Sequence, residues 1–153
     1  MKKVLICTGL FTLLFTAAQA QEDNSSNYNN AIGIRLGPSS AAVKSGISFK
    51  HFLSNNNALE GIVGFGDGVT ICGLYEIHKP LPAENLQWFI GFGAYAGFTG
   101  KTTNIGGAGI IGLDYNFASI PLNLSLDWKP ELNLIEQVGF EASTVGLSIR
   151  YRF

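Results

Sequence analysis

The chain has 153 residues, with ten basic and 11 acidic side chains and a formal net charge of −1. This length is enough for one domain. A nucleic-acid partner would require a basic face, and the near-neutral balance argues against one.

Residues 1–20 read as a secretory signal peptide. Two lysines supply the positive start, residues 4–16 form an apolar run, and Ala18-Gln19-Ala20 gives a small-x-small cleavage site. The run is shorter than the roughly 20 residues of a membrane-spanning helix. Cleavage after Ala20 leaves 133 residues, of which eight are basic and 11 acidic, a net charge of −3. Since Cys72 is then the one remaining cysteine, we expect no intramolecular disulfide.

Eight later segments alternate apolar and polar residues with a period of two, which is typical of strands that bury one face. A flexible polar lead-in, residues 21–30, precedes them. The pattern predicts strands at residues 31–37, 44–51, 59–65, 69–78, 88–97, 110–117, 122–129 and 143–153. Gly66-Asp67-Gly68 is a strong hairpin signal. Two polar stretches, residues 99–106 and 130–140, are predicted to be loops.

The last segment separates its two faces most clearly. Its apolar face carries Val145, Leu147, Ile149, Tyr151 and Phe153, and its other face carries Gly146, Ser148, Arg150 and Arg152. This ending resembles the terminal strand of bacterial outer-membrane β-barrels, whose final Phe is part of a signal read by the barrel-assembly machinery. The resemblance implies that Tyr151 and Phe153 act as the assembly signal.

By architecture, the whole mature chain resembles small eight-stranded outer-membrane proteins of the OmpA/OmpX kind. The 133 mature residues allow about 17 per strand with its connection, against the roughly 9 to 11 that cross an outer membrane obliquely. The resemblance implies an all-β fold, an eight-stranded antiparallel up-and-down transmembrane β-barrel over residues 31–153. It also implies a location in the bacterial outer membrane, in contact with lipid and lipopolysaccharide.

Charged residues avoid the apolar faces of all eight segments. Ten lie on the opposite faces: Arg35, Lys44, Lys50, Glu60, Glu76, Asp114, Asp127, Lys129, Arg150 and Arg152. A basic side chain at the lipid midplane costs about 2 to 4 kcal/mol, so a lipid-facing surface would exclude such groups. We therefore expect the charges to point into the barrel, where unpaired burial would be costly. The predicted polar network of the lumen comprises Arg35, Glu60, Glu76, Asp114, Asp127 and Arg150.

Aromatic residues cluster near the ends of the predicted strands. With both termini in the periplasm, Tyr75, Trp88, Tyr115 and Phe117 fall near the inner rim and Trp128 near the outer one. Two aromatic girdles around an aliphatic band are typical of membrane barrels and distinguish them from soluble ones.

Two sequence features suggest other chemistry but lack the context that it needs. Residues 107–112 match G-x-G-x-x-G, yet no helix is predicted after them, as a dinucleotide site requires. His51, His78 and Cys72 have no paired spacing typical of metal ligands. We expect no cofactor and no metal.

The leading hypothesis is a non-enzymatic, monomeric outer-membrane barrel with a structural or surface-interaction role. We expect no open pore, because side chains fill a barrel of eight strands. One alternative is a soluble periplasmic barrel of lipocalin type that turns its apolar faces inward and binds a small apolar ligand. Another is a lipid-modifying barrel enzyme, although Ser48, His51 and Glu60 do not share one face as a hydrolase site would require.

Overall fold

A computed structural model of the chain describes residues 28–135 and 138–153, and these residues are all-β. The predicted signal peptide and most of the lead-in lie outside them. The strands are β1 (Asn30–Leu36), β2 (Gly46–Phe52), β3 (Asn57–Phe65), β4 (Val69–Pro80), β5 (Leu86–Thr99), β6 (Thr102–Asn116), β7 (Leu122–Trp128), β8 (Glu131–Asn133), β9 (Gly139–Glu141) and β10 (Val145–Arg152). No helix in the described part of the chain is long and apolar enough to cross a membrane.

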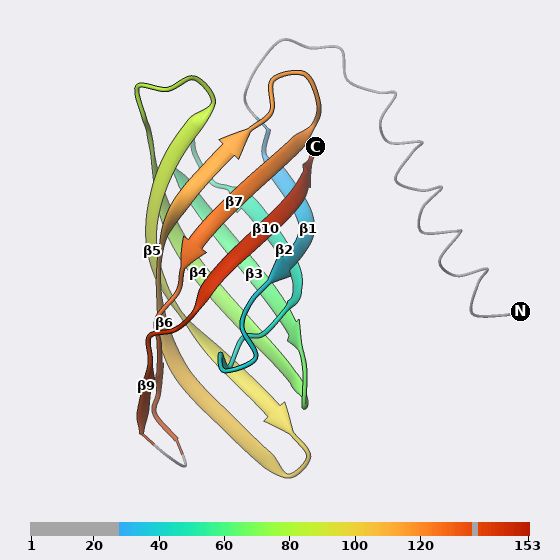
Figure 1. The fold of residues 1–153 in the computed structure, drawn as a ribbon, viewed down its shortest axis with the longest axis vertical. Helices are drawn as coiled ribbons and strands as arrows, with labels where there is room; N and C mark the ends of the chain where they lie inside the picture. Colours follow the sequence, from blue (N-terminus) through green and yellow to red (C-terminus); the bar gives the residue numbers. More distant parts are fainter. Residues whose placement is uncertain (1–27, 136–137) are drawn as a thin grey trace, which may run out of the picture.

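Strands β1 to β7 and β10, eight in all, form a closed barrel, as Figure 1 shows. Strands β1 to β7 pair antiparallel with their sequence neighbours, and β10 lies between β7 and β1. The β5–β6 pairing, which runs from Leu86↔Tyr115 to Thr99↔Thr102, closes the sheet. The predicted eight-stranded antiparallel up-and-down barrel is thus confirmed.

Both ends of the described barrel chain lie at the same rim. Asn30 and Phe153 exchange backbone hydrogen bonds of 3.0 and 2.8 Å, which join β1 to β10. We call this rim the terminal end; the turns at residues 53–56, 81–85 and 117–121 also lie there. We call the opposite rim the mouth.

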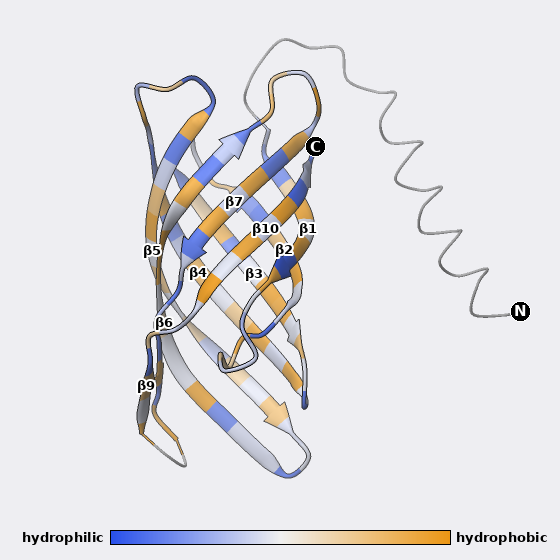
Figure 2. Cartoon of the chain, viewed as in Figure 1, coloured by the Kyte–Doolittle hydropathy of each residue, from blue (hydrophilic) through white to orange (hydrophobic). Residues whose placement is uncertain are grey.

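The alternation of residues along the strands determines what faces inward and outward. On β1, Ile34 is 55% exposed, whereas the next residue, Arg35, is 1% exposed. Figure 2 shows the same alternation of apolar and polar bands along β7 and β10. Because successive strand side chains point to opposite faces, the polar set fills the barrel and the apolar set covers it. An inner apolar patch is the exception, formed by Val43, Ile62, Cys72, Leu74, Phe89, Tyr95, Ala108 and Ile110.

The prediction of a loop at residues 99–106 was wrong, because β6 already begins at Thr102. Only Gly100 and Lys101 separate β5 from β6, and Gly100 has a φ of +59°, which glycine adopts without strain. Polarity suggested a loop, but threonine is β-branched and favours strands. The long β5–β6 hairpin therefore forms one wall of the mouth.

The predicted loop at residues 130–140 also contains strands, the β8–β9 hairpin. β8 continues along β6 beyond β7, with Ala108 opposite Glu131. Pro130 interrupts the two strands because it has no N–H to donate, but its carbonyl accepts a 3.0 Å bond from Gly109 N. The acidic residue Glu131 is thereby placed on the inner face, where it is 2% exposed.

Candidate functional site

The terminal half of the lumen contains a connected group of ionisable side chains, which we call the Lys50 network. Its members are Lys50, Glu60, Glu76, His78, Asp114 and Arg150, all buried. Lys50 Nζ lies 2.8 Å from a Glu76 oxygen, 3.2 Å from Asp114 and 3.7 Å from Glu60. The single ammonium therefore connects carboxylates from β3, β4 and β6.

Arg150 completes this network from β10. Its Nη2 lies 2.5 Å from Glu60 Oε1, its Nε donates to Ser48 Oγ at 2.7 Å, and its Nη1 donates to Asn123 Oδ1 at 3.1 Å. A guanidinium suits this position because its donors are held in a rigid planar fork. The side chain therefore joins β10 to β2, β3 and β7 across the lumen.

Aromatic rings extend from the Lys50 network to the terminal end. Lys50 Nζ lies 4.5 Å from the centroid of Phe89, and the Phe89 ring stacks on His78 at 5.0 Å. Phe52 lies 5.0 Å from His78 and 5.1 Å from Tyr28, whose phenol has a raised pKa because it is buried. Cation–π contacts of this kind are stronger when the cation is desolvated, as Lys50 is here.

The mouth half of the lumen contains two separate ion pairs. Arg35 pairs with Asp127, and their side chains are each 1% exposed. Lys129 pairs with Glu131, a residue of the predicted loop at residues 130–140. No ion pair among the described residues links these two pairs to each other or to the Lys50 network.

The Lys129–Glu131 pair also fixes the β1–β2 loop in the mouth. Glu131 accepts hydrogen bonds from Ala42 N at 2.6 Å and Val43 N at 3.3 Å. Thr70 Oγ1 donates to Ala42 O at 2.9 Å from the opposite wall. With Val43 fully buried, the loop folds into the mouth and narrows it.

Inward glycines leave room for the large inner side chains. A Cβ at Gly146 would lie 2.2 Å from Arg35 Nη2, and one at Gly112 would lie 2.7 Å from the ring of Phe89. Both distances are far below van der Waals contact, so any larger residue at these two positions would collide with a side chain that fills the lumen.

The six residues predicted to form the lumen network divide into two groups. Glu60, Glu76, Asp114 and Arg150 lie in the Lys50 network, and Arg35 and Asp127 pair with each other nearer the mouth. The network predicted from the sequence lacks four buried residues: Lys50, His78, Lys129 and Glu131. The two-residue alternation already places Lys50 and Lys129 on the inward face of their strands, so both could have been included in the predicted network. Glu131 could not, because its segment was predicted to be a loop without inward and outward faces. Lys44 and Arg152, at the two rims, are only partly buried.

The predicted girdle residues all lie on the outer face, at different heights. Trp88, Tyr115 and Phe117 lie towards the terminal end, and Trp128 ends β7 near the mouth, where its indole Nε1 donates to Ala142 O at 2.6 Å. Tyr75 lies near the middle of β4, because this strand continues to Pro80.

The residues considered for hydrolase or metal chemistry do not assemble into one site. Ser48 Oγ donates to Glu60 at 2.5 Å inside the barrel, whereas His51 Nδ1 lies 2.8 Å from Asn30 Oδ1. Cys72 is buried as a free thiol. Within residues 28–135 and 138–153, no group of three or more His, Cys, Asp or Glu side chains is placed to hold a metal ion.

No protein-family model and no curated protein sequence matches the chain. A solved structure does match it, the N-terminal β-barrel domain of OprF from Pseudomonas aeruginosa. The two align over 82% of this chain and 98% of that chain, with a TM-score of 0.59 and 16% sequence identity. The chain shares with that domain the fold of a closed, eight-stranded antiparallel β-barrel. At this identity the likeness shows the fold alone.

Proposed function

We propose that the chain is an integral outer-membrane barrel with a non-enzymatic role in envelope structure or surface interaction. The observation that carries the proposal is the inverted distribution of polarity across the sheet. Buried inside are four cations and five anions, namely Arg35, Lys50, Lys129, Arg150, Glu60, Glu76, Asp114, Asp127 and Glu131. Outside, exposed apolar side chains occur on every barrel strand, for example Leu36, Ile47, Val63, Ile71, Ile90, Leu113, Leu126 and Ile149.

A lipid environment accounts for this distribution better than water does. Soluble monomers rarely expose contiguous apolar patches beyond a few hundred Å². A closed barrel leaves no unpaired strand edge, which is the condition for crossing lipid with strands. The alternative of a soluble lipocalin-like barrel requires the apolar faces to point inward, which is the opposite of the observed arrangement.

The filled lumen supports a barrel that is not an open pore. The Lys50 network spans the terminal half, and the β1–β2 loop with Val43 narrows the mouth. An eight-stranded barrel is just wide enough to be filled by its own side chains. We propose that the protein is a monomer in contact with lipid and lipopolysaccharide, and that the barrel-assembly machinery recognises Tyr151 and Phe153.

Heat modifiability tests membrane insertion directly. The membrane fraction is run on a denaturing gel with and without boiling. We expect a faster unboiled band that shifts on heating, because a closed barrel stays folded in detergent. A protein that remains in the soluble fraction and shows no shift would contradict the proposal.

A charge on the outer face gives a sharper version of this test. Ile34→Arg places a cation midway along β1, where a lipid-facing site would disfavour it by about 2 to 4 kcal/mol. The matched control is Ala83→Arg in the exposed β4–β5 turn. We expect only Ile34→Arg to lose the folded band in membranes. Equal yields of folded protein from both variants would indicate that water, not lipid, surrounds the barrel.

The absence of an enzymatic role is tested separately. A barrel that modified lipid A would leave a chemical difference in the envelope. We expect the lipid A composition of a deletion strain to match that of the parent strain by mass spectrometry. Loss of one lipid A species, restored by complementation, would assign the chain to lipid-modifying enzymes instead.

A further inference from the structure

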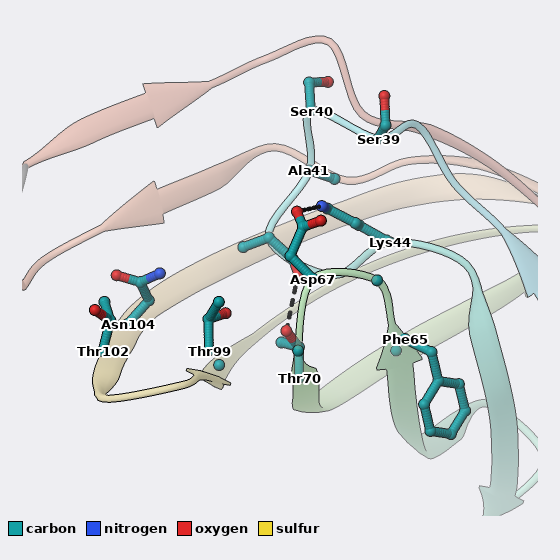
Figure 3. A pocket seen from close by; sticks show the side chains of 15 residues that line it. Ser39, Ser40, Ala41, Lys44, Phe65, Asp67, Thr70, Thr99, Thr102 and Asn104 are labelled. Carbon is teal, nitrogen blue, oxygen red and sulfur yellow. Dashed lines mark hydrogen bonds and ion pairs between the residues drawn. The ribbon is translucent and has the colours of Figure 1, made fainter.

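The mouth of the barrel contains a cavity of about 360 Å³, which we call the mouth pocket (Figure 3). It lies between the β1–β2 loop and the ends of β3 to β6 and falls within the size range of small-ligand pockets, about 300 to 1,000 Å³. Its polar side chains are Ser39, Ser40, Lys44, Asp67, Thr70, Thr99, Thr102 and Asn104. The pocket plays no part in the buried ion pairs of the lumen.

The charges of the mouth pocket neutralise each other. Lys44 Nζ lies 2.5 Å from Asp67 Oδ2, and Figure 3 shows the two side chains pointing toward each other. The hydrogen bond and the charge of Lys44 lower the pKa of the Asp67 carboxyl, so this carboxylate stays ionised at neutral pH. An anionic ligand would meet the Asp67 carboxylate and a cationic one the Lys44 ammonium. The pocket therefore favours a neutral ligand.

Five other polar side chains of the pocket are available for such a ligand. Those of Ser39, Ser40, Thr99, Thr102 and Asn104 make no hydrogen bond to any described residue. Figure 3 shows the last three on the β5–β6 hairpin and the two serines on the β1–β2 loop. Each hydroxyl both donates and accepts, as the Asn amide does. Such groups complement a ligand that carries many hydroxyls, because each ligand hydroxyl also donates and accepts.

The pocket is also preformed and kept open. Thr70 and Glu131 fix the backbone of the β1–β2 loop through Ala42. Small residues leave the hydroxyls accessible: a Cβ at Gly97 would lie 3.1 Å from Thr70 Oγ1, and one at Gly68 would lie 2.8 Å from Thr99 Oγ1. A preformed site loses less conformational entropy on binding.

We propose that the mouth pocket binds a neutral saccharide through the hydroxyls of Thr99 and Thr102 and the amide of Asn104. In an outer-membrane barrel with both termini in the periplasm, the mouth pocket opens to the outside of the cell. The source of the sugar therefore rests on the proposed function, whereas binding itself does not. The saccharide is either a free sugar or the glycan part of a surface glycolipid, because both present the same hydroxyl groups.

The test uses NMR of the folded, isotope-labelled mature chain, in detergent or in plain buffer, whichever keeps it folded. The probes are maltose, a neutral oligosaccharide fraction released from lipopolysaccharide, and sodium phosphate as a charged control. We expect a saccharide, but not phosphate, to shift the amide signals of Thr99, Thr102 and Asn104. A response to maltose identifies a free-sugar site, and a response to the released oligosaccharide alone identifies a glycolipid site.

Variants then locate the site. Thr102→Val with Asn104→Leu removes two polar groups, and we expect at least about tenfold weaker saccharide binding. The matched control Thr103→Val, on the opposite face of β6, should bind as the unaltered chain does. If the β6 variant does not fold, Ser39→Ala with Ser40→Ala tests the loop side of the pocket without altering a strand. Absence of saccharide-induced shifts in a correctly folded chain, or stronger binding of phosphate, would overturn the proposal whatever the membrane tests show.

Discussion

The two halves of the lumen bury charge in different ways. In the terminal half, Lys50 lies within 4 Å of three carboxylates and Arg150 joins one of them, so several strands share one network. In the mouth half, Arg35–Asp127 and Lys129–Glu131 are separate pairs. Removing one member of a buried ionic group leaves the others uncompensated, whereas replacing a complete pair by apolar groups is often tolerated. In the terminal half, we therefore expect removal of any one member of the network to lower the free energy of unfolding. In the mouth half, we expect single substitutions to do so, whereas replacement of both members of a pair should be tolerated.

The largest effect is expected from Arg150→Met. Loss of the guanidinium leaves Glu60 with one ion pair, the 3.7 Å contact to Lys50, and removes the hydrogen bonds that Arg150 donates to Ser48 Oγ and Asn123 Oδ1. We expect a decrease of about 3 to 5 kcal/mol in the free energy of unfolding, measured by urea titration of the barrel in lipid vesicles. Arg150→Lys is the control that keeps the charge. Because an ammonium lacks the planar fork of the guanidinium, we expect it to restore only part of the free energy of unfolding that Arg150→Met loses. A loss below about 1 kcal/mol would mean that the network does not depend on this residue.

A mutant cycle on Arg35 and Asp127 tests whether the mouth pair is separable. We expect Arg35→Met alone to cost about 3 kcal/mol, because it leaves Asp127 buried without its partner. Adding Asp127→Leu should restore most of that loss in the same urea titration. If the double variant is less stable than Arg35→Met alone, each charge stabilises the barrel by more than compensating its partner. The two halves of the lumen would then not differ in the way described.

Two glycines on opposite faces of the sheet are expected to respond with opposite sign. Gly146→Ala forces the Arg35 guanidinium to move, and we expect a loss of about 1 to 3 kcal/mol. Gly73→Ala, on the outer face, meets no atom within 4 Å and should stabilise the barrel by about 0.5 to 1 kcal/mol. The measurement is the urea midpoint of each variant. Equal destabilisation by both would indicate that backbone conformation, not lumen packing, requires the glycines.

The barrel could be predicted from the sequence because the two-residue alternation of apolar and polar residues indicates both where the strands lie and which side chains share a face of the sheet. The same rule assigned Arg35 and Arg150 to the lumen. It failed at residues 102–106 and 131–133, where polar residues continue as strand because a long neighbour, β6 or β5, offers a partner. Which charges pair depends on register and strand tilt, so parity alone did not separate the Lys50 network from the Arg35–Asp127 pair. The mouth pocket also depends on the fold of the β1–β2 loop, for which the sequence has no periodic signal.

The smallest effect is expected at the exposed ion pair of the mouth, which provides a surface reference for the buried pairs. The hydrogen bond and charge of Lys44 lower the pKa of Asp67. A lowered pKa means that the stabilisation by the charged pair is present above the unfolded-state pKa and is lost as the pH falls through the folded-state value. Lys44→Met should therefore raise the Asp67 pKa toward its ordinary value in a carbon-detected NMR titration and leave neutral-pH stability almost unchanged. Because Asp67 is solvent-exposed, added salt should produce a similar rise in the unaltered chain. If neither added salt nor the substitution changes the Asp67 pKa, then the backbone of the turn, and not Lys44, lowers it.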